Sequence, residues 1–185
     1  MTNGANNPSR YRADETLRDG GLVHVRAIAP DDRDRLASHF HSLSEESVYH
    51  RFFGLKHHLS HQELVYLTQL DFVNHVGLVA TYYKDGSEQF IGVARYIRSD
   101  DPKRAEVAFA VSDAHQGRGV ATLLLDHLAD IARAAGIEIF EAIVMSDNSK
   151  MLEVLDHSGF AVSRKSEIGT VRVTMELGQS SLSNP

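Results

Sequence analysis

The chain contains no cysteine, and this absence excludes several kinds of chemistry at once. Disulfide frameworks, cysteine-based zinc sites, iron–sulfur clusters and thiol nucleophiles all require that residue. Runs of about 18 or more apolar residues are also lacking, so no transmembrane helix is predicted. The first residues contain no apolar segment typical of a signal peptide, and we therefore expect a cytoplasmic protein.

An excess of positive charge is the second feature that the sequence lacks. It has 19 Lys and Arg against 25 Asp and Glu, which gives a net charge of −6. Nucleic-acid binders usually carry a basic face, so neither a nucleic acid nor a membrane is expected as partner. An anionic ligand would need a local positive site strong enough to overcome the overall field.

The length and composition indicate one folded domain. The chain has 185 residues, of which 42% are hydrophobic, enough for a core without disulfides or metals. Residues 1–20 and 179–185 are polar and show little periodicity, so we predict flexible tails around a domain over residues 21–178.

Hydrophobic periodicity predicts an α+β domain with a mixed, about seven-stranded sheet flanked by helices. The expected strands are 22–28, 76–83, 90–97, 105–111, 137–145, 160–162 and 170–177. The expected helices are 30–43, 44–53, 60–70, 120–135 and 148–158. Asp85-Gly86 predicts a tight hairpin turn, and the nearly continuous apolar run of 137–145 predicts a strand buried on both faces.

A glycine-rich turn before the helix at 120 is the strongest chemical signal. Free N–H groups at a helix start attract anions, and Gly117 and Gly119 would let a phosphate approach the backbone. Ordinary turn chemistry explains the same spacing. The Walker pattern fails because Val120 follows Gly119, and the dinucleotide fingerprint is weakened by Thr122 in place of its last glycine or alanine.

Residues 116–121, QGRGVA, resemble the Gln/Arg-x-x-Gly-x-Gly/Ala motif of the GNAT superfamily of acyl-CoA N-acyltransferases. The order of elements over about residues 21–178 is also similar to that family. The resemblance implies that acetyl-CoA lies between two splayed parallel strands, 105–111 and 137–145, and that no metal is needed. It assigns to the cofactor Phe109, Val111, Gln116, Gly117, Arg118, Gly119, Val120, Ala121, Thr122 and Asn148.

Several further segments, among them Arg51-Phe52-Phe53 and Leu59-Ser60, resemble bacterial Pat-type protein lysine acetyltransferases. That resemblance implies that Glu106 is the general base. A lysine with a pKa near 10.4 is protonated at pH 7 and must lose a proton before it attacks. We expect an apolar strand to desolvate Glu106 and raise its pKa, although exposure to solvent or pairing with Arg95 or Arg104 is the alternative.

Leu155, the backbone near Val111 and the histidines are the other candidates for a part in the reaction. Many family members have a Tyr seven residues after the asparagine that matches Asn148, but here that position is Leu155, which we expect in the core. A backbone N–H near Val111 is the expected oxyanion donor. His75 borders the expected acceptor region, but a structural role is favoured over proton transfer. His57, His58 and His61 lack the spacing of a metal site.

The sequence therefore predicts an acetyl-CoA-dependent N-acetyltransferase. The acceptor is expected to be a protein lysine, attacked in a ternary complex because no cysteine can carry the acyl group. A small-molecule amine acetyltransferase and a catalytically silent acyl-CoA sensor remain as alternatives, and so does a more distant dinucleotide-binding fold. Whether the chain forms a homodimer is left open.

Overall fold

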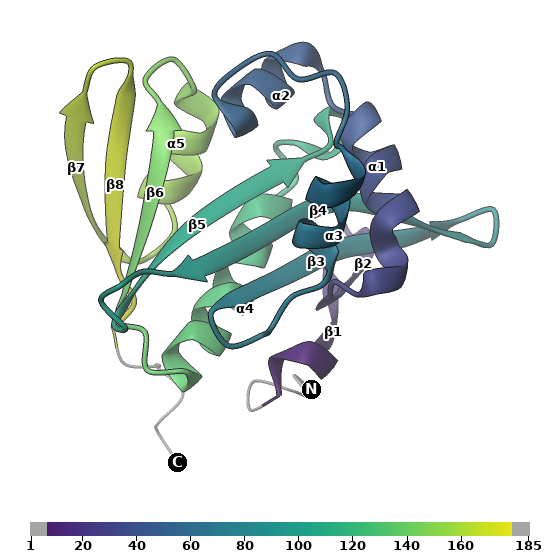
Figure 1. Ribbon diagram of the computed structural model, residues 1–185, viewed down its shortest axis with the longest axis horizontal. Helices are drawn as coiled ribbons and strands as arrows, with labels where there is room; N and C mark the ends of the chain where they lie inside the picture. Colours follow the sequence, from purple (N-terminus) through teal and green to yellow (C-terminus); the bar gives the residue numbers. More distant parts are fainter. Residues whose placement is uncertain (1–6, 179–185) are drawn as a thin grey trace.

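The computed structural model describes residues 7–178 as an eight-stranded sheet with five α-helices (Figure 1). The strands are β1 (Arg12–Thr16), β2 (Leu22–Ala27), β3 (His75–Lys84), β4 (Ser87–Arg98), β5 (Arg104–Val111), β6 (Ile139–Met145), β7 (Ala161–Glu167) and β8 (Thr170–Glu176). The α-helices are α1 (Arg33–His41), α2 (Glu45–Phe52), α3 (His61–Thr68), α4 (Val120–Ala134) and α5 (Ser149–Asp156). Short 3₁₀ turns cover Pro8–Arg10, Pro30–Asp32 and Asp113–His115.

The sheet is mixed, as predicted, with the strand order β1-β2-β3-β4-β5-β6-β8-β7. Its neighbours pair antiparallel except β5 and β6, which run parallel and are joined through α4. A parallel pair needs such a crossover, whereas hairpins suffice for the antiparallel strands. The mixed single-domain fold expected from the sequence is confirmed, and the sheet has one strand more than expected.

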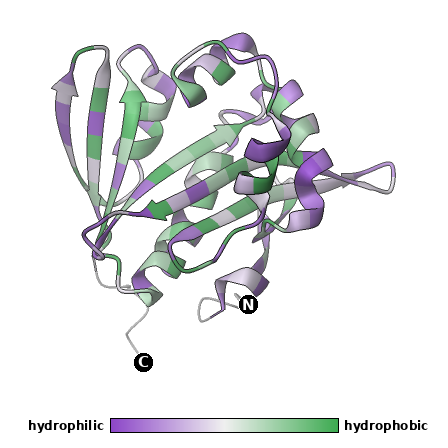
Figure 2. Cartoon of the chain, in the orientation of Figure 1, coloured by the Kyte–Doolittle hydropathy of each residue, from purple (hydrophilic) through white to green (hydrophobic). Residues whose placement is uncertain are grey.

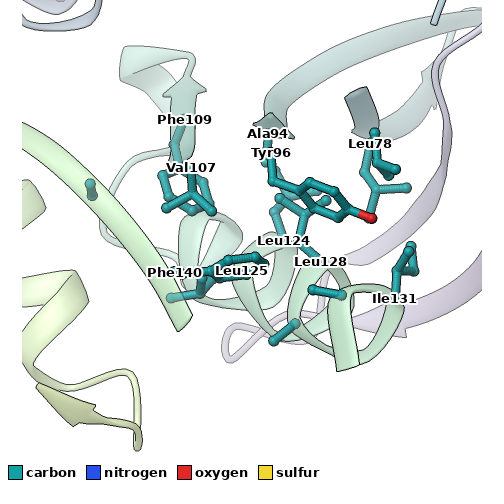
Figure 3. Packing of buried hydrophobic residues seen from close by; sticks show 14 of the residues in the cluster. Leu78, Ala94, Tyr96, Val107, Phe109, Leu124, Leu125, Leu128, Ile131 and Phe140 are labelled. Carbon is teal, nitrogen blue, oxygen red and sulfur yellow. The ribbon is translucent and has the colours of Figure 1, made fainter. Parts of the chain in front are cut away.

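Helix α4 packs on one face of the sheet and forms the main core. Leu124, Leu125, Leu128 and Ile131 recur at helical spacing and are fully buried. They meet side chains from the central strands, including Tyr96 on β4, as Figure 3 shows. Hydrophobic residues concentrate on these central elements, whereas the edge strand β7 is mostly hydrophilic (Figure 2).

Helices α1 to α3 build a second, smaller core on the opposite face of the sheet. Leu36 and Phe40 of α1 pack with Val48 of α2 and with Val79 and Val93 of the central strands. Figure 1 shows α1 and α3 in front of the strands and α4 behind them. No helix of the described residues is long and apolar enough to cross a membrane.

The segment predicted as an N-terminal tail contains strand β1, so that prediction is wrong for its second half. Tyr11, Ala13 and Leu17 alternate with polar residues and are buried against the main core. A strand of five residues rich in charge gives almost no periodic signal, and only its pairing with β2 reveals it. Residues 179–185, the predicted second tail, lie outside the described residues.

Strand β6 also differs from its prediction. It was expected to be buried on both faces, yet its residues alternate between buried and half-buried positions. Phe140, Ala142 and Val144 face the core, while the residues between them face the open side of the sheet. An apolar run cannot by itself tell a doubly buried strand from one beside a cleft.

Two local signals are confirmed in detail. Asp85 and Gly86 both have positive φ, 51° and 77°, and connect β3 to β4 as a two-residue turn of the primed type. Ser60 accepts a hydrogen bond from the Glu63 N–H and the Glu63 carboxylate accepts from the Ser60 N–H, which is a complete capping box.

Candidate active site

A cleft opens where the two parallel strands separate. Strands β5 and β6 pair only from Arg104↔Ile139 to Glu106↔Glu141, although both continue for several residues. The space between them belongs to a cavity of about 950 Å³, which also reaches the start of α4 and the helices α2 and α5. Such a volume is typical of a site for a large small-molecule ligand.

The backbone edge of β5 is free along this cleft. Phe109 and Val111 direct their side chains into the main core, so the cleft meets their main chain. Residues 107–111 pair with β4 along one edge of the strand. Their other edge has no partner strand, because the pairing with β6 ends at Glu106. Backbone N–H and C=O groups left in this way can pair with the amides of an extended ligand.

The start of α4 presents unpaired amides to the same cleft. Gly119 is the N-cap residue with φ 91°, and it provides no side-chain cap; the first turn carries no acidic residue. The N–H groups of Val120, Ala121 and Thr122 therefore have no partner within the helix. Gly117 is likewise left-handed, with φ 74°, and open space surrounds the position where a Cβ would lie. These donors, together with the helix dipole, form a cradle for an anion.

A hydrogen-bond network fixes the loop that precedes α4. The Gln116 amide donates to Ser47 Oγ at 3.1 Å and to the Val111 carbonyl at 3.2 Å. Asp113 accepts from the Ser44 N–H and from the hydroxyls of Ser44 and Ser47. Burial raises the pKa of Asp113, but these hydrogen bonds outweigh burial and hold the pKa below its usual value. The loop is thereby tied to α2, a link that the sequence did not indicate.

Arg118 has a different environment from the one its place in the motif suggests. Its Nε donates to Asp19 Oδ2 at 2.5 Å, and this ion pair raises the pKa of Arg118. Arg118 is absent from the residues that line the cleft, whereas Arg18 is one of them. No sequence pattern points to Arg18, because it lies in the segment predicted as a tail.

Asn148 and Leu155, at the start of α5 and within it, lie where the sequence predicted them. Asn148 lines the cleft, and its side-chain oxygen caps α5 by accepting from the Met151 N–H at 3.1 Å. Its cap role was not predicted. Leu155 is fully buried in the main core, as expected, so no hydroxyl stands at the position where the resemblance implies a tyrosine.

Glu106 lies at the floor of the cleft, on the last residue pair before the strands separate. Its side chain is exposed, so the apolar surroundings expected from the sequence are not found. Within residues 7–178 it makes no ion pair, because Arg104 pairs instead with Glu141 at 3.0 Å and with Asp101 at 3.4 Å. A free carboxylate thus faces the open cleft.

The half-buried Arg51 and the buried Arg95 lie near this part of β5. Burial lowers the pKa of Arg51, and the charge of Glu106 acts in the opposite direction. Burial, together with the charge of Arg51, lowers the pKa of Arg95 to about 9. Arg95 donates to His75 Nε2 at 3.2 Å, and burial with the charge of Arg95 lowers the pKa of His75 to about 4. His75 is therefore a neutral acceptor for Arg95, which agrees with the structural role favoured above.

The remaining histidines do not assemble a metal site. His57, His58 and His61 are all exposed around the start of α3. Over residues 7–178, no group of three or more His, Asp or Glu side chains could hold a metal ion.

The arrangement fits a ligand with a diphosphate and an amide-containing arm. The amides of α4 would hold the phosphates, the free edge of β5 would pair with the arm, and the reactive end would lie toward Glu106. Coenzyme A has this chemistry, so the residues present suit the cofactor that the sequence resemblance implies.

Comparisons with known proteins point in the same direction. The family described as Acetyltransferase (GNAT) matches residues 43–160. The crystal structure of the GNAT domain of S. lividans PAT is 43% identical, covers 89% of this chain and 96% of that one, and superposes with a TM-score of 0.82. An acetyltransferase from Salmonella typhimurium, solved with acetyl-CoA, has a TM-score of 0.67 over 88% of this chain and 98% of that one; at 19% identity it shows the fold alone.

Curated relatives include two acetyltransferases. One from Pseudomonas aeruginosa is 28% identical over 84% of each chain. Acetyltransferase Pat of Mycolicibacterium smegmatis is 31% identical over 87% of this chain, which spans only 47% of that protein's length.

Proposed function

This chain belongs to the acetyltransferase (GNAT) family, whose activity is acetyl-CoA-dependent acetylation, and we propose that its acceptor is a protein lysine with Glu106 as general base. The similarity to the GNAT domain of S. lividans PAT and the resemblance of the sequence to Pat-type lysine acetyltransferases support this acceptor class. The single observation that carries the proposal is the unpaired Glu106 carboxylate at the floor of the cleft.

We assign the cofactor to the residues that the sequence indicated, apart from the side chain of Arg118, which pairs with Asp19. The N–H groups from Gly117 to Thr122 would hold the diphosphate, and the main chain of Phe109 and Val111 would pair with the pantetheine arm. The side chain of Gln116 would act indirectly, by holding the loop against Val111 and Ser47. Acetyl-CoA, when bound, supplies the activated thioester acyl group.

Glu106 would remove the proton that prevents a lysine from attacking. At pH 7.4 about one lysine in a thousand is deprotonated, given a pKa near 10.4. A carboxylate that takes the proton, directly or through one water, contributes about 10²–10⁴ to the rate. The amine nitrogen then forms a bond to the acyl carbon and the carbon–sulfur bond breaks. The nitrogen loses its second proton in this step, and that proton passes through water to the leaving thiolate, because Leu155 has none to give.

Exposed apolar side chains beside the cleft favour a protein over a small amine as acceptor. Large exposed hydrophobic residues on and around α2 and α3 are Tyr49, Phe53, Leu55, Tyr66 and Val73. Phe53 also lines the cleft, and the exposed Ile97 is the cross-strand neighbour of Glu106. Apolar surface of this kind, next to a reactive group, is typical of a protein-binding face.

The test compares Glu106→Gln with Glu141→Gln. The two glutamates are neighbours in the β5–β6 register, but Glu141 pairs with Arg104. We expect Glu106→Gln to lower kcat about 10²–10⁴-fold with acetyl-CoA affinity nearly unchanged, while Glu141→Gln stays within about threefold of wild type. The readouts are thiol release with lysine peptides or protein and acetyl-lysine detected by mass spectrometry.

Three outcomes would overturn parts of the proposal. An unchanged pH–rate profile in Glu106→Gln would remove Glu106 from the role of base. Thiol release with a small amine but not with lysine in peptides or proteins would make the acceptor a small molecule. Binding of acetyl-CoA without thiol release toward any amine would make the chain a sensor.

A further inference from the structure

We infer that Arg18, at the tip of the β1–β2 hairpin, binds the diphosphate of coenzyme A as a second, cationic wall of its site. This inference rests on the proposed placement of the diphosphate at the start of α4, and it adds a residue from outside the glycine-rich motif. An anionic ligand on a chain of net charge −6 needs a local positive site. The backbone amides at the start of α4 carry only partial charges, so a full positive charge would strengthen that site.

The position of Arg18 is the first observation. A Cβ built on Gly119 would lie 3.7 Å from Arg18 Nε and 3.9 Å from its Cγ and Cδ. The Arg18 side chain therefore packs on the residue that begins α4, and it lines the same cavity as Gln116 and Gly117. Throughout residues 7–178 no carboxylate forms an ion pair with Arg18, so its five N–H donors remain available.

The second observation explains why Arg18, and not Arg118, would fill this role. Asp19 accepts from the Gly21 N–H with Oδ1 and from Arg118 Nε with Oδ2. The Arg118 guanidinium lies over Gly21, where a Cβ would be only 2.9 Å from its Nη2. Asp19 thus holds Arg118 of the motif against the hairpin. Its neighbour in the hairpin, Arg18, remains beside the amides at the start of α4.

The hairpin is anchored well enough to position a ligand. Leu17 is buried in the main core, and its N–H donates to the Gly21 carbonyl at 2.8 Å, which closes the turn. Tyr11 Oη forms a hydrogen bond of 2.6 Å with Nδ1 of His127 in α4. Glu15 Oε1 lies 3.3 Å from Nε2 of the same ring. The hairpin is therefore held against the helix that carries the amides, and a guanidinium placed there suits two phosphate oxygens.

The test measures dissociation constants for CoA without any acceptor, so it does not depend on the identity of the amine. Arg18→Gln is compared with Arg12→Gln, an exposed arginine of β1 that does not line the cleft, and with Arg118→Gln. Each variant changes the net charge equally, from −6 to −7. We expect Arg18→Gln to weaken CoA about tenfold, Arg12→Gln less than twofold, and Arg118→Gln less than Arg18→Gln.

Two analogues identify the phosphate that is bound. The loss in Arg18→Gln should persist with 3′-dephospho-CoA and disappear with pantetheine, which has no diphosphate. It should also shrink at high ionic strength, because Arg18 is exposed. Thermal unfolding of the free variant should match wild type, which separates a binding effect from a folding effect.

Each contrary result overturns the inference in a recognisable way. Equal losses in Arg18→Gln and Arg12→Gln would mean that only the overall charge matters. A loss that vanishes with 3′-dephospho-CoA would move Arg18 to the 3′-phosphate, and a larger loss in Arg118→Gln would return the role to the motif arginine. If wild type bound none of the three ligands, the proposed function would fall together with this inference.

Discussion

The hydrogen bond between Tyr11 and His127 offers a direct test that the first strand belongs to the fold. Tyr11 Oη and His127 Nδ1 are 2.6 Å apart, and both residues are buried. Tyr11→Phe keeps the ring and removes only the hydroxyl, which leaves Nδ1 without a partner. Burial raises the pKa of Tyr11 to about 12, so the hydroxyl is neutral throughout any ordinary assay.

The magnitude follows from the cost of unpaired buried groups. Leaving one such group without a partner costs about 1–3 kcal/mol. Tyr11→Phe leaves the imidazole nitrogen without a partner, and His127→Leu leaves the hydroxyl without one. Each variant should therefore lose about that much free energy of unfolding. The double variant removes both groups and leaves no partner unpaired. Its loss of stability should therefore be smaller than the sum of the two single losses by about 1–2 kcal/mol. For a domain of this size each 1 kcal/mol lowers Tm by about 2–4 °C.

The assay is urea unfolding of wild type, both single variants and the double variant, with m compared across the set. Tyr83→Phe is the matched control, because Tyr83 is 64% exposed and should lose nothing measurable. Additive losses in the cycle would refute the coupling between Tyr11 and His127. A Tyr11→Phe protein as stable as the Tyr83→Phe protein would refute the claim that this strand is held to α4.

Two further predictions concern packing and pH. A Cβ on Gly92 would lie 2.8 Å from Val120 Cγ1, which is buried, so Gly92→Ala should cost about 1–3 kcal/mol in urea unfolding. Gly54→Ala, with nothing within 4 Å, should be neutral, and equal effects would contradict the packing argument. Burial and the charge of Arg95 lower the pKa of His75 to about 4, so the unfolded chain gains its proton first as pH falls below about 6.5. The free energy of unfolding should therefore drop by up to about 3 kcal/mol between pH 6.5 and pH 4, and His75→Gln should reduce that drop. If the pH dependence of stability in His75→Gln matched wild type, His75 would not be the group responsible.

Much of the cofactor side of the site could be predicted from the sequence, because its signals are local. The left-handed glycines, the apolar repeat of α4 and the strand before it lie within about thirty consecutive residues. The capping box at Ser60 and the hairpin turn at Asp85 were predictable for the same reason. In each case the backbone conformation depends on residues a few positions apart.

The surroundings of the site depended on contacts between distant residues. Arg118 meets Asp19 across 99 positions, Gln116 meets Ser47 across 69, and Tyr11 meets His127 across 116. No periodicity or spacing reports such pairs, because they form only when the sheet brings its first strand and α2 against α4. The sequence by itself thus predicted an anion-binding turn at the start of α4. Only the tertiary structure decided that Arg18 lies beside that turn and that Glu106 faces an open cleft, because both depend on packing between elements far apart in the chain.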